Sequence, residues 1–373
     1  MLKMRFKRVS VFFLPCVLLV ILLTSCGSRN SDLFQETYFD GQYTIHYIDN
    51  NDGTCAIYDC EGELPEIFSV PEYTSSGLMV TSLNDDCFFG NSDRVTDVII
   101  PDTIQKIGAY VFGMGRGIRH ISLGKNVDSI SCFAFCDAES IEIISCDDND
   151  KYMDIDGKCL TDINGQTLIL GTSSGFIPNS ISKIGDYAFA STVFISDMVI
   201  PENVTEIGRY AFTFSFNLGD VNLSNNIISV GEGAFSYSDV RSVRGGQYEV
   251  LNSKVFADCE FLTYVSLPQS LCTIRRCAFL GNEQLKVLHI PNHVSNMEEY
   301  AISSFDTQIC CEAFVRPTGW AENWSGDNTS IIWGCSQNNH TMGVFDVAPY
   351  MLWGNSEDDS TTIIDRFIVI WEE

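Results

Sequence analysis

One phrase recurs along this chain with a period of 23 residues, and it limits the folds that the chain can adopt. In its complete form it reads Val199-Ile200-Pro201, then Val204, then Ile207-Gly208 and Ala211-Phe212. The same spacing separates the members of four phenylalanine pairs: Phe112 and Phe135, Phe189 and Phe212, Phe212 and Phe235, Phe256 and Phe279. A fixed period of this length indicates a stack of similar small units rather than one closed globule. Such a stack exposes an extended surface, so we expect binding before catalysis.

Each unit begins with apolar residues at its first, fourth and sixth positions, as in Val95-Val98-Ile100 and Ile195-Met198-Ile200. The last two are separated by one residue, which is the period of a half-buried strand. A proline usually follows and ends the strand, because proline has no N–H for further pairing. The phenylalanines that close the units are predicted to stack inside as a spine: Phe88, Phe112, Phe135, Phe189, Phe212, Phe235, Phe256 and Phe279.

The residues between the apolar positions of each strand are predicted to face outward from the sheet that these strands form. They form the best candidate for a partner-binding site: Ile99, His120, Ser122, Val199, Asp220, Asn222, Arg244, Tyr264, Ser266 and His289. Ile99 and Val199 are apolar where water is expected, which favours contact with a partner. Each is equally consistent with an isolated exposed aliphatic side chain.

The first 25 residues are predicted to be a lipoprotein signal peptide. A basic start leads into Val11 to Leu23, an apolar run too short to span a bilayer comfortably. Leu23-Thr24-Ser25-Cys26 then resembles a bacterial lipobox, which implies that Cys26 is lipidated and anchors the chain to a membrane. The alternative is an ordinary secretory signal. Residues 26–42 are predicted to be the anchor and a polar tether, with the protein facing the extracytoplasmic side of a bacterial envelope, at the cell surface or in the periplasm.

The net charge bears on the class of partner, and the cysteine content bears on packing and on disulfides. The formal net charge of −27 argues against direct binding of nucleic acid, because like charges repel. Of fifteen cysteines, Cys87, Cys132 and Cys277 occupy positions where the repeat favours a small apolar residue, so we expect ladder packing there. Cys55 and Cys60 are a local candidate for a disulfide, although the sequence does not fix any connectivity.

The repeats are predicted to span residues 65–311, with a hairpin inserted at about 142–175 where Phe135 and Phe189 lie 54 residues apart. Residues 43–64 alternate around Asp52-Gly53 and are predicted to form an N-terminal cap hairpin. Residues 312–335 form a C-terminal module, and 336–373 a tail. Its strong strand pattern, Phe367 to Trp371, is expected to cover the last repeat and protect an open sheet edge.

The complete phrase, the inserted hairpin and the segment Cys311 to Gly334 together resemble the BspA-like leucine-rich repeats of bacterial surface proteins. The resemblance covers about Tyr43 to Gly334. It implies a curved leucine-rich-repeat solenoid, β-rich, with short parallel strands on its inner face. It also implies a surface role in adhesion to host proteins or other cells, and it brings no catalytic residues. The repeat at Val240 to Gly246 departs from the pattern because it lacks Ile-Pro.

No catalytic, metal or cofactor site is predicted. The acidic run Asp147 to Asp150 with Asp154 and Asp156 suggests calcium, but Tyr152 stands where an EF-hand needs an acid. His289 and His293 are separated by Pro291, which disfavours a shared helical face. No nucleophile elbow, zinc-protease motif, phosphate loop or Rossmann glycine run occurs.

We therefore predict a lipid-anchored solenoid that binds a protein or another cell-surface ligand and has no enzymatic activity. Two alternatives stay open. One is a structural or envelope-assembly lipoprotein without a host ligand. The other is an enzyme whose site lies at the C-terminal module, in a cleft lined by acids next to Trp320 or Trp324.

Overall fold

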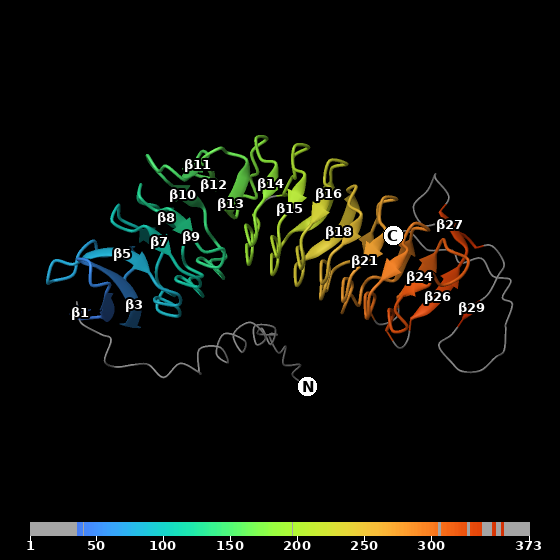
Figure 1. Ribbon diagram of the computed structural model, residues 1–373, viewed down its shortest axis with the longest axis horizontal. Helices are drawn as coiled ribbons and strands as arrows, with labels where there is room; N and C mark the ends of the chain where they lie inside the picture. The colour runs from blue at the N-terminus through green and yellow to red at the C-terminus, as the bar shows by residue number, and fades with distance from the viewer. Residues whose placement is uncertain are drawn as a thin grey trace, which may run out of the picture.

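The structure is a computed structural model that describes residues 36–39, 41–195, 197–304, 307–326, 329–337, 345–347 and 352–353. These residues form a β-solenoid of about 12 turns with a period of about 23 residues, which confirms the predicted fold. The turns lie side by side in a curved row (Figure 1). Every regular element of these ranges is a strand, so they contain no apolar helix long enough to cross a membrane. Cys26 and the predicted signal peptide at 1–25 lie outside the described residues.

Most turns contribute one strand to a column of parallel strands that we call the first sheet. Its register follows the repeat, because His120 pairs with Asp97 on one side and with Ile143 on the other, 23 residues away each time. The column consists of three hydrogen-bonded groups. Its strands are β4 (Ile67–Ser69), β6 (Asp97–Ile99), β8 (His120–Ser122), β10 (Ile143–Ser145), β16 (Gly219–Leu223), β18 (Val240–Gly245), β20 (Tyr264–Val265), β22 (Val287–Ile290), β24 (Gln308–Cys311) and β26 (Ser330–Trp333).

A second column of shorter parallel strands, the second sheet, carries the Ile-Gly part of the phrase. For example, Ile207 pairs with Ile184 and with Val230 in the neighbouring turns. Its strands are β5 (Met79–Leu83), β7 (Lys106–Ile107), β9 (Ser129–Ile130), β13 (Thr167–Gly171), β14 (Lys183–Ile184), β15 (Glu206–Ile207), β17 (Ser229–Val230), β19 (Val250–Leu251), β21 (Thr273–Ile274), β23 (Asn296–Met297) and β25 (Gly319–Trp320).

The proline of the phrase makes the bend between the two sheets. Val204 donates its N–H to the carbonyl of Pro201 at 3.1 Å, and the same contact joins Ile104 to Pro101. The bend buries Val204 and leads into β15. Gly208 follows, and it packs so closely on the preceding turn that a Cβ there would lie 2.6 Å from the backbone N of Asp186. Position 208 therefore requires glycine, because any larger residue would collide with the backbone of the preceding turn.

The predicted phenylalanine spine is present. Phe212 and Phe235 are fully buried, and their ring centroids lie 5.2 Å apart with the planes 3° from parallel. Similar stacked contacts of 5.3–5.7 Å link the other neighbouring pairs within each half of the solenoid. Towards the C-terminus, Ile302 takes the place of the aromatic ring, and its N–H donates to the carbonyl of the buried Trp324.

One of the predicted inward positions is wrong. Ile195 is 75% exposed, whereas the first apolar residue of other units, such as Val95 and Leu262, is buried. The neighbouring Phe194 fills the core instead, with its ring centroid 5.6 Å from that of Phe189. An aromatic ring one position earlier therefore displaces the isoleucine to the surface.

The insertion interrupts the second sheet between β9 and β14, but the turns before and after it stay in contact elsewhere. Strands β11 (Tyr152–Asp154), β12 (Cys159–Asp162) and β13 are antiparallel, and β13 then pairs in parallel with β14. Meanwhile the turn before the insertion lies directly against the turn after it. Ser191 Oγ donates to Asp137 Oδ1 at 2.7 Å, and the rings of Phe133 and Tyr187 have centroids 4.0 Å apart.

Strand β12 lies between two hydrophobic cores and contributes side chains to both. Its side chains alternate, so that Leu160 belongs to the N-terminal core and Cys159 to the C-terminal core. Both residues are fully buried. The two halves of the solenoid therefore share one strand through their interior.

Antiparallel strands lie at both ends of the stack. At the N-terminus β1 (Glu36–Phe39), β2 (Tyr43–Asp49) and β3 (Thr54–Gly62) form a meander, and β3 pairs in parallel with β5. At the C-terminus β29 (Leu352–Trp353) pairs antiparallel with β26, and β27 (Cys335–Gln337) pairs with β28 (Phe345–Val347). The predicted capping strand, Phe367 to Trp371, lies outside the described residues.

The cysteine predictions have mixed outcomes. Cys87 is fully buried, as expected, but Cys132 is exposed and Cys277 is half-buried in a left-handed turn with φ of 57°. Cys55 and Cys60 both lie on β3. Since a strand rises about 3.3 Å per residue, they stand about 16 Å apart along it, too far for a disulfide.

Candidate interaction surface

The first sheet presents two columns of side chains to its outer face. In β4, β6, β8 and β10 the middle residue of each strand is buried, and the residues on either side of it are at least partly exposed. The buried residues are Phe68, Val98, Ile121 and Ile144. This alternation is what a strand with one face on the core requires.

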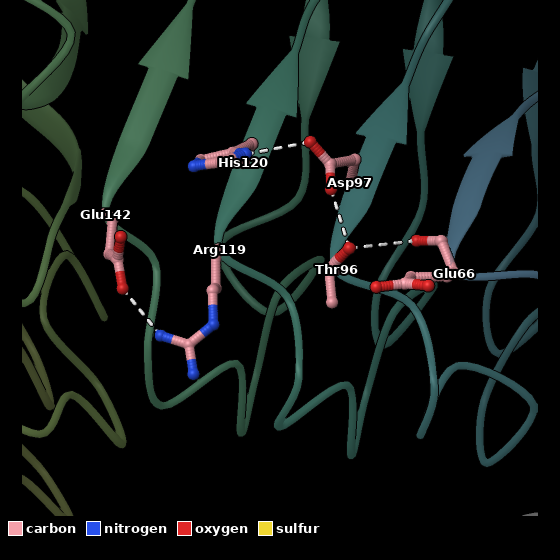
Figure 2. Close-up of polar contacts among 6 residues, drawn as sticks. All are labelled: Glu66, Thr96, Asp97, Arg119, His120 and Glu142. Carbon is pink, nitrogen blue, oxygen red and sulfur yellow. Dashed lines mark hydrogen bonds and ion pairs between the residues drawn. The ribbon is translucent and has the colours of Figure 1, made fainter.

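Asp97 and His120 lie at the centre of this face. The Nδ1–H of His120 donates to Asp97 Oδ1 at 2.8 Å, and the hydroxyl of Thr96 donates to Asp97 Oδ2 at 2.6 Å (Figure 2). Thr96 Oγ1 also lies 3.2 Å from the backbone carbonyl oxygen of Glu66. The hydrogen bond from Thr96, followed by that from His120, lowers the pKa of the Asp97 carboxyl. Asp97 is therefore held ionised on the surface.

A second polar pair lies at the edge of the same strands. Arg119 and Glu142, on neighbouring turns, form an ion pair at 2.5 Å (Figure 2). Both side chains are about half exposed, so solvent screens the attraction and the pair adds at most about 1 kcal/mol of stability. The pairing neutralises the charges of Arg119 and Glu142 together.

Aliphatic side chains surround the polar centre. Ile67 pairs in register with Asp97, and Ile143 with His120, and these isoleucines are 63% and 48% exposed. Ile99 is 41% exposed on the same face, at the other end of β6 from Asp97. Beyond the insertion the next turn adds Ile195 and Val199, which are 75% and 72% exposed. We call these five residues the aliphatic patch.

The face becomes polar towards the C-terminus. Ser242 Oγ donates to Asp220 Oδ1 at 2.8 Å between β18 and β16. The Arg244 guanidinium carbon lies 5.1 Å from the centroid of the Tyr264 ring, in cation–π contact. This half of the sheet presents hydrogen-bonding groups rather than apolar area.

The site residues proposed from the sequence fall into two groups by exposure. The exposed group contains Ile99, Val199, Asp220, Asn222 and Arg244. The half-buried group contains His120, Ser122, Tyr264, Ser266 and His289. The side chain of His289 is only 11% exposed, and it pairs with Glu312 at 3.4 Å.

Four members of the face were missed by the sequence reading. Asp97 stands one period before His120 and Ile143 one period after it, so the repeat spacing alone would have placed both beside the histidine. Ile67 is 30 residues from Asp97, and the irregular spacing conceals it. Ile195 was assigned to the core.

Residues of the acidic run in the insertion form hydrogen bonds with backbone groups near them. Asn149 is buried and donates to the carbonyls of Gly124 and Val127, and Asp154 accepts the backbone N–H groups of Cys146 and Gly157. Across the described ranges, no group of three histidine, cysteine or acidic side chains is arranged to hold a metal ion.

The tryptophans of the C-terminal module belong to the core. Trp320 and Trp324 are 4% and 3% exposed, and their rings meet edge to face with centroids 4.8 Å apart. They are therefore structural residues of the last turns.

Solved structures with a similar chain path come from several bacteria. A leucine-rich repeat protein from Eubacterium ventriosum is 18% identical, over 78% of this chain and 99% of that chain, with a TM-score of 0.46. One from Bacteroides ovatus is 16% identical, over 80% and 71%, with a TM-score of 0.38. The pneumococcal vaccine antigen PcpA is 14% identical, over 83% and 90%, with a TM-score of 0.39. No curated protein matches the chain.

The repeat itself matches a family model. The BspA type leucine-rich repeat region occurs in six copies, over residues 81–172, 170–261 and 249–310. These matches run from residue 81 to residue 310, which is more than half of the 373 residues. The residues that match this model include the strands, the bends and the phenylalanine spine described above. This chain therefore belongs to the BspA-type leucine-rich-repeat family.

Proposed function

We propose that this chain is a lipid-anchored protein of the bacterial envelope that binds a protein partner through the first sheet. The aliphatic patch is the observation that carries the proposal. Ile67, Ile99 and Ile143 lie on the face of the first sheet, Ile195 and Val199 lie on the turn that follows the insertion, and each of the five side chains is 41–75% exposed to water. Scattered exposed aliphatic residues are ordinary, but a gathered apolar surface rimmed by polar groups marks an interaction site.

The charges around the patch indicate the chemistry of the partner. Glu66 and Asp197 are exposed at its edges, and the chain as a whole carries a formal charge of −27. A protein segment that offers aliphatic side chains together with lysine or arginine would match both properties. Complementary charge would speed the encounter, and burial of the aliphatic groups would supply the affinity.

The envelope location rests on the N-terminal sequence and on the family. Leu23-Thr24-Ser25-Cys26 has the pattern of a lipobox, and lipidation of Cys26 would hold the solenoid at a membrane surface. Family membership supports a surface role, because these repeats are typical of bacterial surface proteins. An anchored solenoid has its whole face available to large ligands.

Binding should be measured with the mature chain on immobilised proteins of the extracellular matrix and on a panel of basic and acidic peptides. The test variant is Ile99→Thr with Val199→Thr, which keeps a β-branched side chain at both positions and removes apolar area from the patch. Ile228→Thr is the matched control, because Ile228 is 62% exposed but precedes β17 of the second sheet. Loss of binding in the double variant alone supports the proposal. Equal binding by all three proteins would place the interaction elsewhere.

A structural role in the envelope is the second candidate. It predicts that the mature chain binds no host protein and that deletion of its gene changes the composition of the envelope. An enzyme is disfavoured, because the repeat family supplies no catalytic residues and both tryptophans of the C-terminal module are buried.

A further inference from the structure

Two buried cysteines meet at the C-terminal end of the solenoid. Cys310 lies on β24, where it pairs in register with Ile332 of β26. The chain leaves β26 through Gly334, whose φ of 73° is left-handed, and reaches Cys335. This bend returns the Cys335 side chain over the strand, and Cys310, Ile332 and Cys335 form a small buried cluster separate from the two main cores.

The two thiols are in direct contact. A side-chain hydrogen bond joins Cys310 and Cys335, and it lowers the pKa of Cys335 while raising that of Cys310. Cys335 Sγ also lies 3.5 Å from the carbonyl oxygen of Ile332. The two residues are only 2% and 3% exposed. Cys335 is thus the sulfur that more readily carries a thiolate, and Cys310 is the thiol next to it.

We propose that Cys310 and Cys335 are a disulfide-forming pair that fastens the terminal turn to the repeat before it. The inference extends the envelope location proposed above, since an extracytoplasmic compartment supplies the disulfide oxidants that the cytoplasm lacks. The 25-residue separation between the two cysteines contains β25 and β26. The bond would therefore close a loop around the whole C-terminal module.

The reaction is a thiol–disulfide exchange with a disulfide-bearing oxidant, either a protein or a small molecule. The Cys335 thiolate attacks the oxidant and breaks its S–S bond, which gives a mixed disulfide and releases one thiol. Cys310 then loses its proton and attacks the Cys335 sulfur, which forms the new S–S bond and releases the second thiol. The oxidant gains the two electrons and the two protons that the cysteines lose. Because both sulfurs are buried in the closed turn, the exchange takes place as the terminal turn opens or folds.

Cys311 supplies an internal comparison. It is the next residue on β24 and is also fully buried, but its side chain faces the opposite side of the sheet and belongs to the main C-terminal core. Alternation along the strand therefore directs one cysteine towards Cys335 and the other away from it.

The test treats the mature chain with oxidised glutathione, blocks the free thiols by alkylation, and cleaves after glutamate. Cleavage at Glu312 and Glu322 places Cys310 and Cys335 on different fragments. We expect one linked pair of these fragments, two hydrogens lighter than their sum, which separates on reduction. Cys310→Ala should abolish the link and Cys311→Ala should retain it. Recovery of both Cys310 and Cys335 as alkylated thiols from the oxidised wild-type chain would overturn the proposal, as would a link lost only in Cys311→Ala.

Hydrogen exchange gives a second readout that needs no variant. Oxidation of the wild-type chain should slow exchange at the amides of Ile331 and Ile332, because the closed loop restrains opening of β26. Exchange that is unchanged by a verified link would contradict the fastening role. Neither measurement involves a binding partner, so failure of the aliphatic patch to bind a ligand would leave this result intact. Recovery of the link from intact cells tests the envelope location separately.

Discussion

The rings of Phe212 and Phe235 are 3° from parallel with centroids 5.2 Å apart, and this single contact repeats along the interior of each half of the solenoid. Both side chains are fully buried. Each of these phenylalanines therefore contacts the turns before and after its own, and it couples neighbouring units through the core.

We expect Phe212→Ala to lower the free energy of unfolding by about 3–5 kcal/mol, because it removes buried ring atoms and leaves a cavity. Chemical denaturation monitored by circular dichroism would measure the loss. Phe261→Ala is the control, since Phe261 is 51% exposed, and surface changes of this kind cost about 0.5 kcal/mol or less. Similar losses in both variants would mean that the spine does not carry the stability.

Gly208→Ala tests the close approach of successive turns. The added Cβ would lie 2.6 Å from the backbone N of Asp186 and 2.6 Å from the carbonyl carbon of Gly185. Backbone atoms cannot move aside as a side chain does, so we expect a loss of roughly 1–3 kcal/mol, the usual cost of overpacking. In Gly326→Ala the nearest atom is the Ser303 hydroxyl oxygen at 3.0 Å, which can rotate away. A thermal melt of the two variants should therefore show the larger loss for Gly208→Ala.

The repeat made most of the fold predictable, because every unit has the same types of residue at the same positions and therefore folds in the same way. The spacing located the strands, the bends at Pro201 and its equivalents, and the spine. The spacing gave a wrong prediction at Ile195, because the adjacent Phe194 is buried in the core in its place. It also gave no sign that Leu160 and Cys159 face two different cores, since that depends on what packs on each side of β12.

The candidate site was less predictable than the fold. Alternation along a strand identifies the residues that point away from the core, and it selected Ile99 and Val199 correctly as exposed. Exposure also depends on the side chains of neighbouring turns, which the alternation of a single strand does not reveal. Glu312 lies beside His289 although it is 23 residues later, and Arg244 lies over Tyr264. These contacts make His289 and Tyr264 less accessible than the sequence alone suggests.

The Asp97 carboxyl should titrate below its ordinary pKa of 3.8, chiefly because of the hydrogen bond from Thr96. A depressed pKa in the folded state means that ionised Asp97 contributes stability above pH 3.8, and that this contribution is lost as the pH falls through the lower folded value. Carboxyl carbon NMR would follow the titration. Thr96→Val should raise the pKa of Asp97 more than His120→Gln does. The reverse order would show that the histidine is the main cause.

Cys26→Ser should release the protein from membranes if Cys26 carries the lipid. A single remaining apolar segment of thirteen residues, Val11 to Leu23, is too short to hold the chain in a bilayer as a spanning helix. Fractionation into detergent and aqueous phases, with metabolic labelling by a palmitate analogue, would measure the change. Cys16→Ser is the matched control within the leader and should keep both the label and the membrane association. Membrane association of Cys26→Ser without label would mean that the anchor lies elsewhere.

His289 makes the C-terminal turns sensitive to mild acid. Burial lowers its pKa below the ordinary 6.5, and the carboxylate of Glu312 at 3.4 Å opposes that shift only in part. The folded state therefore binds fewer protons at this site than the unfolded state does below pH 6.5, so stability is full above that value and decreases as the pH falls through this range. Urea midpoints measured above pH 6.5 and about one unit below it should differ less in His289→Gln than in the wild-type chain. His293→Gln is the control, because His293 is a nearby histidine whose side chain is exposed. An equal acid sensitivity in wild type and His289→Gln would assign the effect to another group.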